Sequence, residues 1–187
     1  MKPTSVVLTA VLLTLLVSVP TTPSQERKQS VSRDQLITAA REIISTSRYA
    51  ALITLDSSGR PQARTVDPFA PDENFVIWIG TNPRTRKVAA IRHNPQVTLY
   101  YFDRESQAYV TIHGTARLVN DAKEKAKHWK EEWKRFYPDR GRDYMLIVVR
   151  SERLELVNVK KGIIGDQQTW HPPSVSFARH RIVRKQP

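Results

Sequence analysis

A short basic stretch, Thr81–Lys87, carries the side chains best suited to bind an anion. It joins a predicted strand to a predicted helix start, and a proline within it favours that start. Free backbone N–H groups and the positive end of a helix dipole attract phosphate there. Thr85 adds a hydroxyl, while Arg86 and Lys87 add charge-assisted hydrogen bonds. Arg64, on the preceding strand, can face the same end of the sheet; the alternative is that all of these are ordinary surface cations.

Other catalytic chemistry has little support in the residue pattern. The chain has no cysteine, which excludes disulfides, thiolate metal sites and cysteine nucleophiles. Its five histidines show neither H-x-x-x-H nor H-E-x-x-H spacing, so no metal site is expected. No G-x-S-x-G sequence is present to mark a serine nucleophile.

The overall charge favours acidic partners. Among 187 residues, 30 Lys and Arg oppose 18 Asp and Glu, giving a net charge of +12. Such an excess favours polyanions, phosphorylated ligands or acidic surfaces. Four cations lie near the C-terminus, at Arg179, Arg181, Arg184 and Lys185. We expect a solvated basic tail there and no nucleic-acid partner; polyanion or membrane-surface binding is the alternative.

The first 24 residues are predicted to be a Sec-type signal peptide. The uncharged apolar run Val6–Val19 has 14 residues, about 21 Å as a helix, whereas the hydrocarbon core of a bilayer is ~30 Å thick. Cleavage near Ser24 would release an exported protein, periplasmic or secreted, with no stable membrane insertion. An uncleaved N-terminal anchor is the alternative. Residues 25–31 are polar and are predicted to form a flexible linker.

The remaining chain alternates between strand and helix patterns. Ser32 and Gln35 form a capping box that opens a helix reaching about Ser47. Further helices are expected from Asn82 to His93 and from Asp121 to about residue 137. Strands are expected at residues 49–55, 60–67, 75–79, 96–102, 109–119, 145–149 and 153–159. Their short connections favour antiparallel pairing, so the fold class is mainly β (α+β): a closed or split antiparallel barrel with helical insertions.

Five sequence blocks, in order and at consistent spacing, resemble the pyridoxamine 5′-phosphate oxidase-like family, the FMN-binding split barrel. These blocks are Gly59–Val66, Phe75–Asn82, Thr85–Lys87, Asn94–Leu99 and Val110–Leu118. The likeness covers roughly residues 32–160, which we take as the FMN-binding domain, followed by a C-terminal loop and basic tail at 161–187. A small general stress protein type is the closer likeness within the family.

The resemblance implies a six-stranded split barrel, a homodimer, and FMN at the subunit interface. The residues that match the family's phosphate ligands and adjoining hydroxyl are Arg64, Arg86, Lys87 and Thr85. The segments that match those approaching the flavin ring are Thr65-Val66 and Gly80-Thr81. The family's interface glutamine falls near Tyr109, or on Gln107 if the strand has a bulge. Trp170 lies over the flavin by analogy, or is a packed loop tryptophan.

Two departures from the family pattern narrow the expected activity. Asp67-Pro68-Phe69 stands where true oxidases of pyridoxamine phosphate have a lysine, and residues 128–137 lack their Tyr-x3-Arg-x3-Ser substrate motif. Pyridoxamine-phosphate oxidase activity is therefore not supported. We expect an FMN-dependent oxidoreductase acting on an unknown small substrate, with F420 as a possible replacement for FMN. The alternative is a non-catalytic module that binds a flavin, F420, haem or another phosphorylated small molecule.

Overall fold

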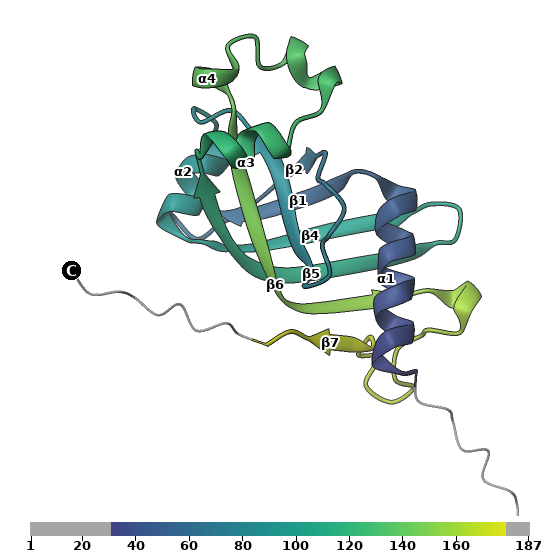
Figure 1. The fold of residues 1–187 in the computed structure, drawn as a ribbon. Coiled ribbons are helices and arrows are strands. Elements are labelled where there is room, and N and C mark those ends of the chain that lie inside the picture. The colour runs from purple at the N-terminus through teal and green to yellow at the C-terminus, as the bar shows by residue number, and fades with distance from the viewer. Residues whose placement is uncertain (1–30, 179–187) are drawn as a thin grey trace, which may run out of the picture. The chain divides into compact units, whose positions relative to one another are not determined.

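A computed structural model describes residues 31–178 (Figure 1). The predicted signal peptide, nearly all of the predicted linker and the four cations of the basic tail lie outside the described residues. In the described part, no helix is both long and apolar enough to cross a membrane.

Helix α1 (Arg33–Ser47) begins at the predicted capping box. The Gln35 amide donates to Ser32 Oγ at 3.2 Å, and the Ser32 amide donates to Gln35 Oε1 at 2.8 Å. One apolar stripe of the helix is buried and faces the sheet, comprising Leu36, Ala39, Ala40, Ile43 and Ile44. Figure 1 shows α1 lying across the sheet, so this stripe forms one wall of the main core.

The sheet is antiparallel throughout and curls into a split barrel, which confirms the predicted fold class. Its strands are β1 (Ala50–Leu55), β2 (Pro61–Val66), β3 (Val76–Thr81), β4 (Gln96–Asp103), β5 (Ala108–Val119), β6 (Met145–Val157) and β7 (Ser174–Ser176). Six of them follow the order β2-β1-β4-β5-β6-β3, and the short β7 pairs with β6. Apolar residues alternate along most strands because one face is buried, as on β5, where Val110 and Ile112 are fully buried while His113 is exposed.

The chain that directly follows β2 meets β3, at the other end of the strand order, in a seam. A single isolated bridge joins Pro68 to Ile79, and the Phe69 amide donates to the Trp78 carbonyl at 2.8 Å. Beside the seam, α2 (Arg86–His93) buries Val88 and packs against β1 and β5. The start of α2 is thereby placed next to β2.

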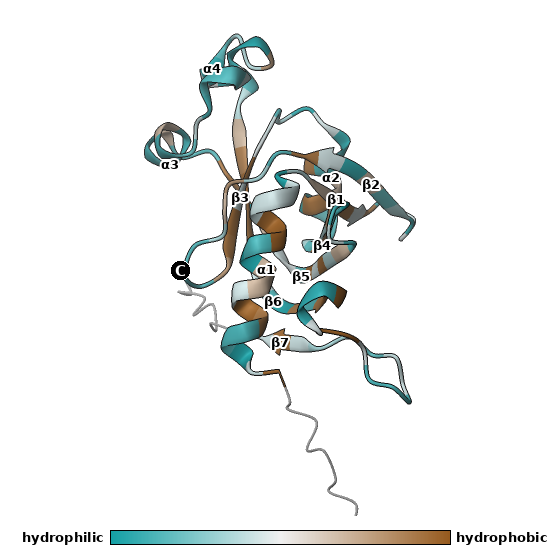
Figure 2. Ribbon diagram, turned by 90° about the vertical axis from the view of Figure 1, so that its right-hand side faces the viewer, coloured by the Kyte–Doolittle hydropathy of each residue, from teal (hydrophilic) through white to brown (hydrophobic). Residues whose placement is uncertain are grey.

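The segment between β5 and β6 (residues 120–144) differs from the single helix predicted over 121–137. It contains α3 (Ala122–Lys127), the 3₁₀ helix η1 (Glu131–Arg135) and α4 (Arg140–Asp143). The chain leaves the helix at His128, whose ring stacks on Trp78 with centroids 4.2 Å apart. Tertiary contacts therefore override the helical pattern, and the aromatic side chains form a second core cluster. Figure 2 shows the contrast between hydrophobic β3 and the largely hydrophilic ribbon of α3 and α4.

Two further differences concern the C-terminal strands. The strands predicted at residues 145–149 and 153–159 are one strand, β6. Its pairing with β5 shifts register opposite His113/Gly114, where Glu152 of β6 is skipped as a bulge. A Cβ at Gly114 would lie 2.3 Å from the Arg150 carbonyl oxygen, so the bulge requires glycine. Strand β7 was not predicted and extends the sheet past residue 160. The 3₁₀ helix η2 (Val159–Lys161) and the loop after it connect β6 to β7.

Candidate anion-binding site

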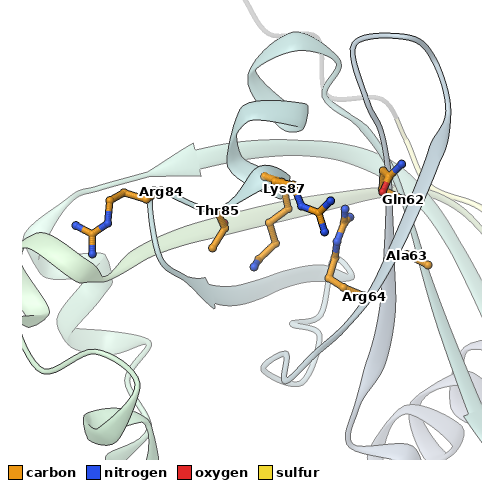
Figure 3. Close-up of a pocket in the computed structure, with 7 residues that line it drawn as sticks. Gln62, Ala63, Arg64, Arg84, Thr85 and Lys87 are labelled. Carbon is orange, nitrogen blue, oxygen red and sulfur yellow. The ribbon is translucent and has the colours of Figure 1, made fainter.

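A cavity of about 400 Å³ lies between β2 and the start of α2 (Figure 3). Six of its seven lining residues have polar or charged side chains, and four are cationic: the lining comprises Gln62, Ala63, Arg64, Arg84, Thr85, Arg86 and Lys87. The cavity therefore brings together four residues that the sequence assigned to the phosphate: Arg64 from the strand, and Thr85, Arg86 and Lys87 from the helix start.

Arg64 reaches the cavity from the core-facing side of β2. It pairs in register with the fully buried Leu52, and directly opposed residues of an antiparallel pair share a face. Its Nη1 donates to Thr54 Oγ1 at 2.8 Å and to the Leu52 carbonyl at 3.2 Å. Burial lowers the pKa of the Arg64 guanidinium, and the nearby Arg86 lowers it further. The side chain is thus held in place on one side by β1, in a positive environment.

The start of α2 offers unused backbone donors. Thr85 is the N-cap, but its hydroxyl donates to the Asn82 carbonyl at 2.9 Å and accepts from no helix amide. Within residues 31–178, the amides of Arg86 and Lys87 have no hydrogen-bond acceptor. The helix was predicted to begin at Asn82, whereas its N-cap is Thr85, three residues later. The two N–H groups at the true start are the kind that bind phosphate.

The cations of the cavity lack a counter-charge within the chain. In the described part, neither Arg64, Arg86 nor Lys87 has a carboxylate oxygen within 4 Å. Burial lowers the pKa of Lys87, and Arg64 lowers it further. The first turn of α2 contains no acidic residue, so the positive end of its dipole is uncompensated as well. Three like charges and a helix start converge, an arrangement that an anion would stabilise.

Arg84 differs from the other cations of the cavity. Its Nη2 donates to Asp143 Oδ1 at 2.9 Å, and Figure 3 shows its guanidinium directed away from Arg64 and Lys87. The side chains of Arg64 and Lys87, in contrast, extend toward the same space. Arg84 is therefore part of the wall and is already paired.

The segments assigned to the flavin ring adjoin this cavity without lining it. Thr81 is buried, and its Oγ1 lies 3.3 Å from Thr85 Oγ1. Val66 is buried in the core, whereas Thr65 is exposed on the opposite face of β2. Gly80 lies beneath two aromatic rings of the β5–β6 segment.

Gln107, Tyr109 and Trp170 do not line the cavity of their own chain. Gln107 occupies the β4–β5 turn with φ at 51°, and the Tyr109 ring stacks on Tyr100 at 5.8 Å. Figure 1 shows this hairpin at the opposite end of the sheet from α2. Trp170, in the η2–β7 connection, is 83% exposed. It is therefore not a packed loop tryptophan, and a role for any of the three at this site requires a second chain.

Three lining residues were not among the predicted ligands: Gln62, Ala63 and Arg84. Gln62 could have been found from strand alternation, since it lies two residues before Arg64 and therefore on the same face. Its side chain is held by Asp56 Oδ2 at 3.2 Å. Arg84 belongs to the basic stretch, but its pairing with a residue 59 positions away has no sequence signal.

The fold and site together define an antiparallel split-barrel protein with a cationic pocket. The family model described as pyridoxamine 5′-phosphate oxidase matches residues 36–158. Because this match covers more than half of the 187 residues, the chain belongs to that family. The resemblance stated from the sequence blocks is thereby confirmed.

Individual relatives agree with this assignment. General stress protein 26 of Bacillus subtilis is 26% identical over 121 residues, which cover 63% of this chain and 84% of the relative. A solved protein from Clostridium acetobutylicum, related to general stress protein 26, superposes with a TM-score of 0.64 at 19% identity, covering 78% and 96% of the two chains. A pyridoxamine 5′-phosphate oxidase-related, FMN binding protein from Nostoc punctiforme gives 0.56 at 13% identity, covering 80% and 98%.

The same fold occurs in proteins whose names refer to F420 or to heme in place of FMN. An F420 reductase superposes with a TM-score of 0.51 at 22% identity, covering 61% of this chain and 94% of its own. A heme binding protein from Mycobacterium smegmatis gives 0.52 at 20% identity, covering 63% and 52%. At these identities the solved structures establish the fold alone. The ligand of this chain has to be inferred from its own residues.

Proposed function

We propose that this protein binds FMN and acts as a flavin-dependent oxidoreductase on a small substrate. The observation that carries the proposal is the cluster of Arg64, Arg86 and Lys87, which has no carboxylate within 4 Å in the described part of the chain and lies beside two free helix amides. The FMN phosphate is largely dianionic at neutral pH, because its second pKa is about 6. The FMN-binding relative from Nostoc punctiforme supports the choice of this phosphate ester.

Three of the lining residues would hold the phosphate. The Arg64 guanidinium, already oriented by Thr54, would meet the phosphate from the strand side. The side chains of Arg86 and Lys87, with their own amides, would meet it from the helix side. FMN, once bound, supplies hydride or single-electron transfer, and the protein positions it and sets its electrostatic surroundings. The cavity volume lies within the ~300–1,000 Å³ typical of small-molecule sites.

The proposal includes a homodimer with the cofactor at the interface. An aromatic patch on the outer face of β4 and β5 supports it, because Tyr100 and Phe102 are 37% and 50% exposed beside Tyr109. A second chain could also bring its Gln107, Tyr109 or Trp170 to this cavity, which none of them lines in its own chain. Sedimentation velocity should give the mass of two chains; a monomer in the presence of saturating FMN would refute this part.

A non-catalytic binding module is the second candidate. One observation favours it: none of the residues that line the cavity is an aspartate, a glutamate or a histidine, so Lys87, with its lowered pKa, is the main lining group for proton transfer. Such a module could hold a flavin, F420, haem or another phosphorylated molecule. Stopped-flow absorbance under argon separates the two, since an oxidoreductase would pass electrons from its chemically reduced flavin to an added electron-accepting substrate, and the flavin would re-oxidise faster than in buffer alone.

The direct test is a titration of the purified full-length chain with FMN and, separately, with riboflavin, which lacks the phosphate. We expect flavin fluorescence to be quenched by tight binding of FMN and far weaker binding of riboflavin. The double variant Arg86→Ala/Lys87→Ala should lose this preference. The control Arg92→Ala/Arg117→Ala removes the same number of positive charges at two exposed positions, neither of which lines the cavity. A colourless wild-type chain that ignores added FMN would refute the proposal.

We further propose that the protein is exported, on the apolar run and cleavage region of residues 1–24. Cell fractionation followed by N-terminal sequencing tests this directly. A chain beginning near Gln25 outside the cytoplasm is expected, and an intact Met1 on a cytoplasmic chain would contradict it.

A further inference from the structure

The β5–β6 segment (residues 120–144) contacts the chain next to each part of the proposed cofactor site. Its first contact is with Asp67, which directly follows β2 and the Thr65-Val66 pair. Lys130 Nζ donates to Asp67 Oδ1 at 2.7 Å, and Trp133 Nε1 donates to Asp67 Oδ2 at 3.2 Å. The end of β2 is therefore fastened to this segment by an ion pair and a hydrogen bond.

The second contact is at Gly80, near the end of β3. A Cβ on Gly80 would lie 2.5 Å from the Trp133 ring and 2.8 Å from the Tyr144 ring, so both rings rest directly on the strand backbone. The Tyr144 hydroxyl donates to the His128 carbonyl, which fixes that ring in turn. The aromatic cluster thus sets the position of the residue pair Gly80-Thr81.

The third contact reaches the loop between β3 and α2. The Asp143 carboxylate, whose side chain is only 6% exposed, accepts from Arg84 Nη2 at 2.9 Å and from Arg142 Nε at 3.3 Å. Arg84 lies just before the N-cap Thr85, and its amide donates to Asn82 Oδ1 at 2.9 Å. Asp143 therefore holds the turn from which the two free helix amides project.

We infer that Asp143 is a positioning residue for the anion site, acting through Arg84 on the start of α2. This inference rests on the proposed function for its ligand, FMN, but its structural consequence can be measured without any ligand. Two ion pairs, the Trp133–Asp67 hydrogen bond and the aromatic contact at Gly80 join the β5–β6 segment to the site. Asp143 pairs with Arg84, which lies nearest in the chain to the two free helix amides.

The sign of the expected effect separates positioning from simple electrostatics. Asp143 contributes a negative charge near a cationic cavity, so removing that charge should strengthen anion binding if long-range attraction alone matters. If Asp143 instead positions Arg84 and the helix start, its removal should weaken binding. The variant Asp143→Asn keeps the size of the side chain and removes only its charge.

A matched control is available on the same short helix. Asp139 is the N-cap of α4, is half exposed and pairs with Arg142 at 3.7 Å, but makes no contact with Arg84. The variant Asp139→Asn removes the same charge and keeps an oxygen for the cap. Fluorescence titration of the full-length chain with FMN should show about tenfold weaker binding for Asp143→Asn, a typical coupling within one network. Asp139→Asn should bind as well as the wild type or slightly better, and Asp143→Glu should recover most of the affinity.

Hydrogen exchange provides the ligand-free measurement. The amides of Thr85 and Val88 are bonded to the carbonyls of Asn82 and Thr85 at 3.2 and 3.0 Å, and they report the order of the helix start. Their exchange should become at least about threefold faster in Asp143→Asn and stay unchanged in Asp139→Asn. If Asp143→Asn does not fold, as judged by near-UV circular dichroism, Arg84→Gln removes the same pair from its exposed side and should give the same increase.

The outcomes separate the two proposals. A wild-type chain that ignores FMN overturns the proposed function, while the exchange of Thr85 and Val88 still decides the role of Asp143. Unchanged exchange in both Asp143→Asn and Arg84→Gln overturns the positioning role. Tighter FMN binding by Asp143→Asn overturns it too, because electrostatics alone would then suffice.

Discussion

Replacing Lys87 by methionine should have opposite effects on ligand binding and on stability. Methionine keeps an unbranched apolar stem and removes the ammonium group. Lys87 is half-buried beside Arg64, and it would give the phosphate a charge-assisted hydrogen bond. Such bonds contribute roughly 1.5–3 kcal/mol, so the Kd for FMN should rise by roughly 10- to 150-fold.

In the ligand-free chain the same substitution should raise the free energy of unfolding. Burial and Arg64 lower the pKa of Lys87 in the folded state, so the unfolded chain binds that proton more tightly. The charged lysine therefore destabilises the fold at neutral pH, and this cost disappears as pH rises through the folded and then the unfolded pKa. Interactions between partly solvated charges are ~0–1 kcal/mol, which bounds the gain in stability.

Urea denaturation without flavin and fluorescence titration with FMN measure the two effects on the same preparations. Lys123→Met, on the exposed face of α3, controls for the loss of one lysine. A variant of Lys87 that binds FMN within threefold of wild type would refute the assignment of this side chain. Lower stability without flavin would refute the argument that Lys87 is held at an electrostatic cost.

Two other predictions concern pH and packing. FMN affinity should fall below about pH 6, where the phosphate takes up a proton; it should fall again in the alkaline range, below the usual lysine pKa of 10.5, because the pKa of Lys87 is lowered. Isothermal titration calorimetry at a series of pH values measures the loss of FMN affinity at both ends of the range. If Lys87→Met still lost affinity at alkaline pH, the assignment of that loss to Lys87 would be wrong. Gly80→Ala should lower the free energy of unfolding by ~1–3 kcal/mol, since its Cβ would overlap Trp133 and Tyr144. Gly141→Ala, whose Cβ would have only one neighbour, at 3.3 Å, is the urea-denaturation control, and equal losses would refute the overlap.

Local sequence signals predicted much of this fold. The capping box at Ser32 placed the start of α1 correctly, and alternation along β5 identified its buried face. The residues of the basic stretch and Arg64 were also grouped correctly, because an antiparallel hairpin and a strand-to-helix turn fix their direction locally. The capping box and the alternation depend on residues within a few positions of one another, whereas the grouping of Arg64 with Arg86 joins two elements 22 positions apart.

The remaining features depend on contacts between distant residues. The pattern of residues 121–137 fits a helix, yet His128 leaves it to stack on Trp78, 50 positions earlier. The Asp143–Arg84 pair likewise joins elements that no periodicity relates. The three-residue β7 is too short to produce a pattern, and it is defined only by its pairing with β6.

The strand order has a consequence for how the protein matures. Although β2 and β3 follow each other in the chain, β3 is held in the sheet by β6, whose residues pair with it from about 70 positions downstream. Closing so long a loop is slow compared with forming the β1–β2 hairpin. A growing or refolding chain therefore fixes β3, and with it the turn that leads into α2, only after β6 has docked. The rate at which a refolding chain gains affinity for flavin would then report this docking step.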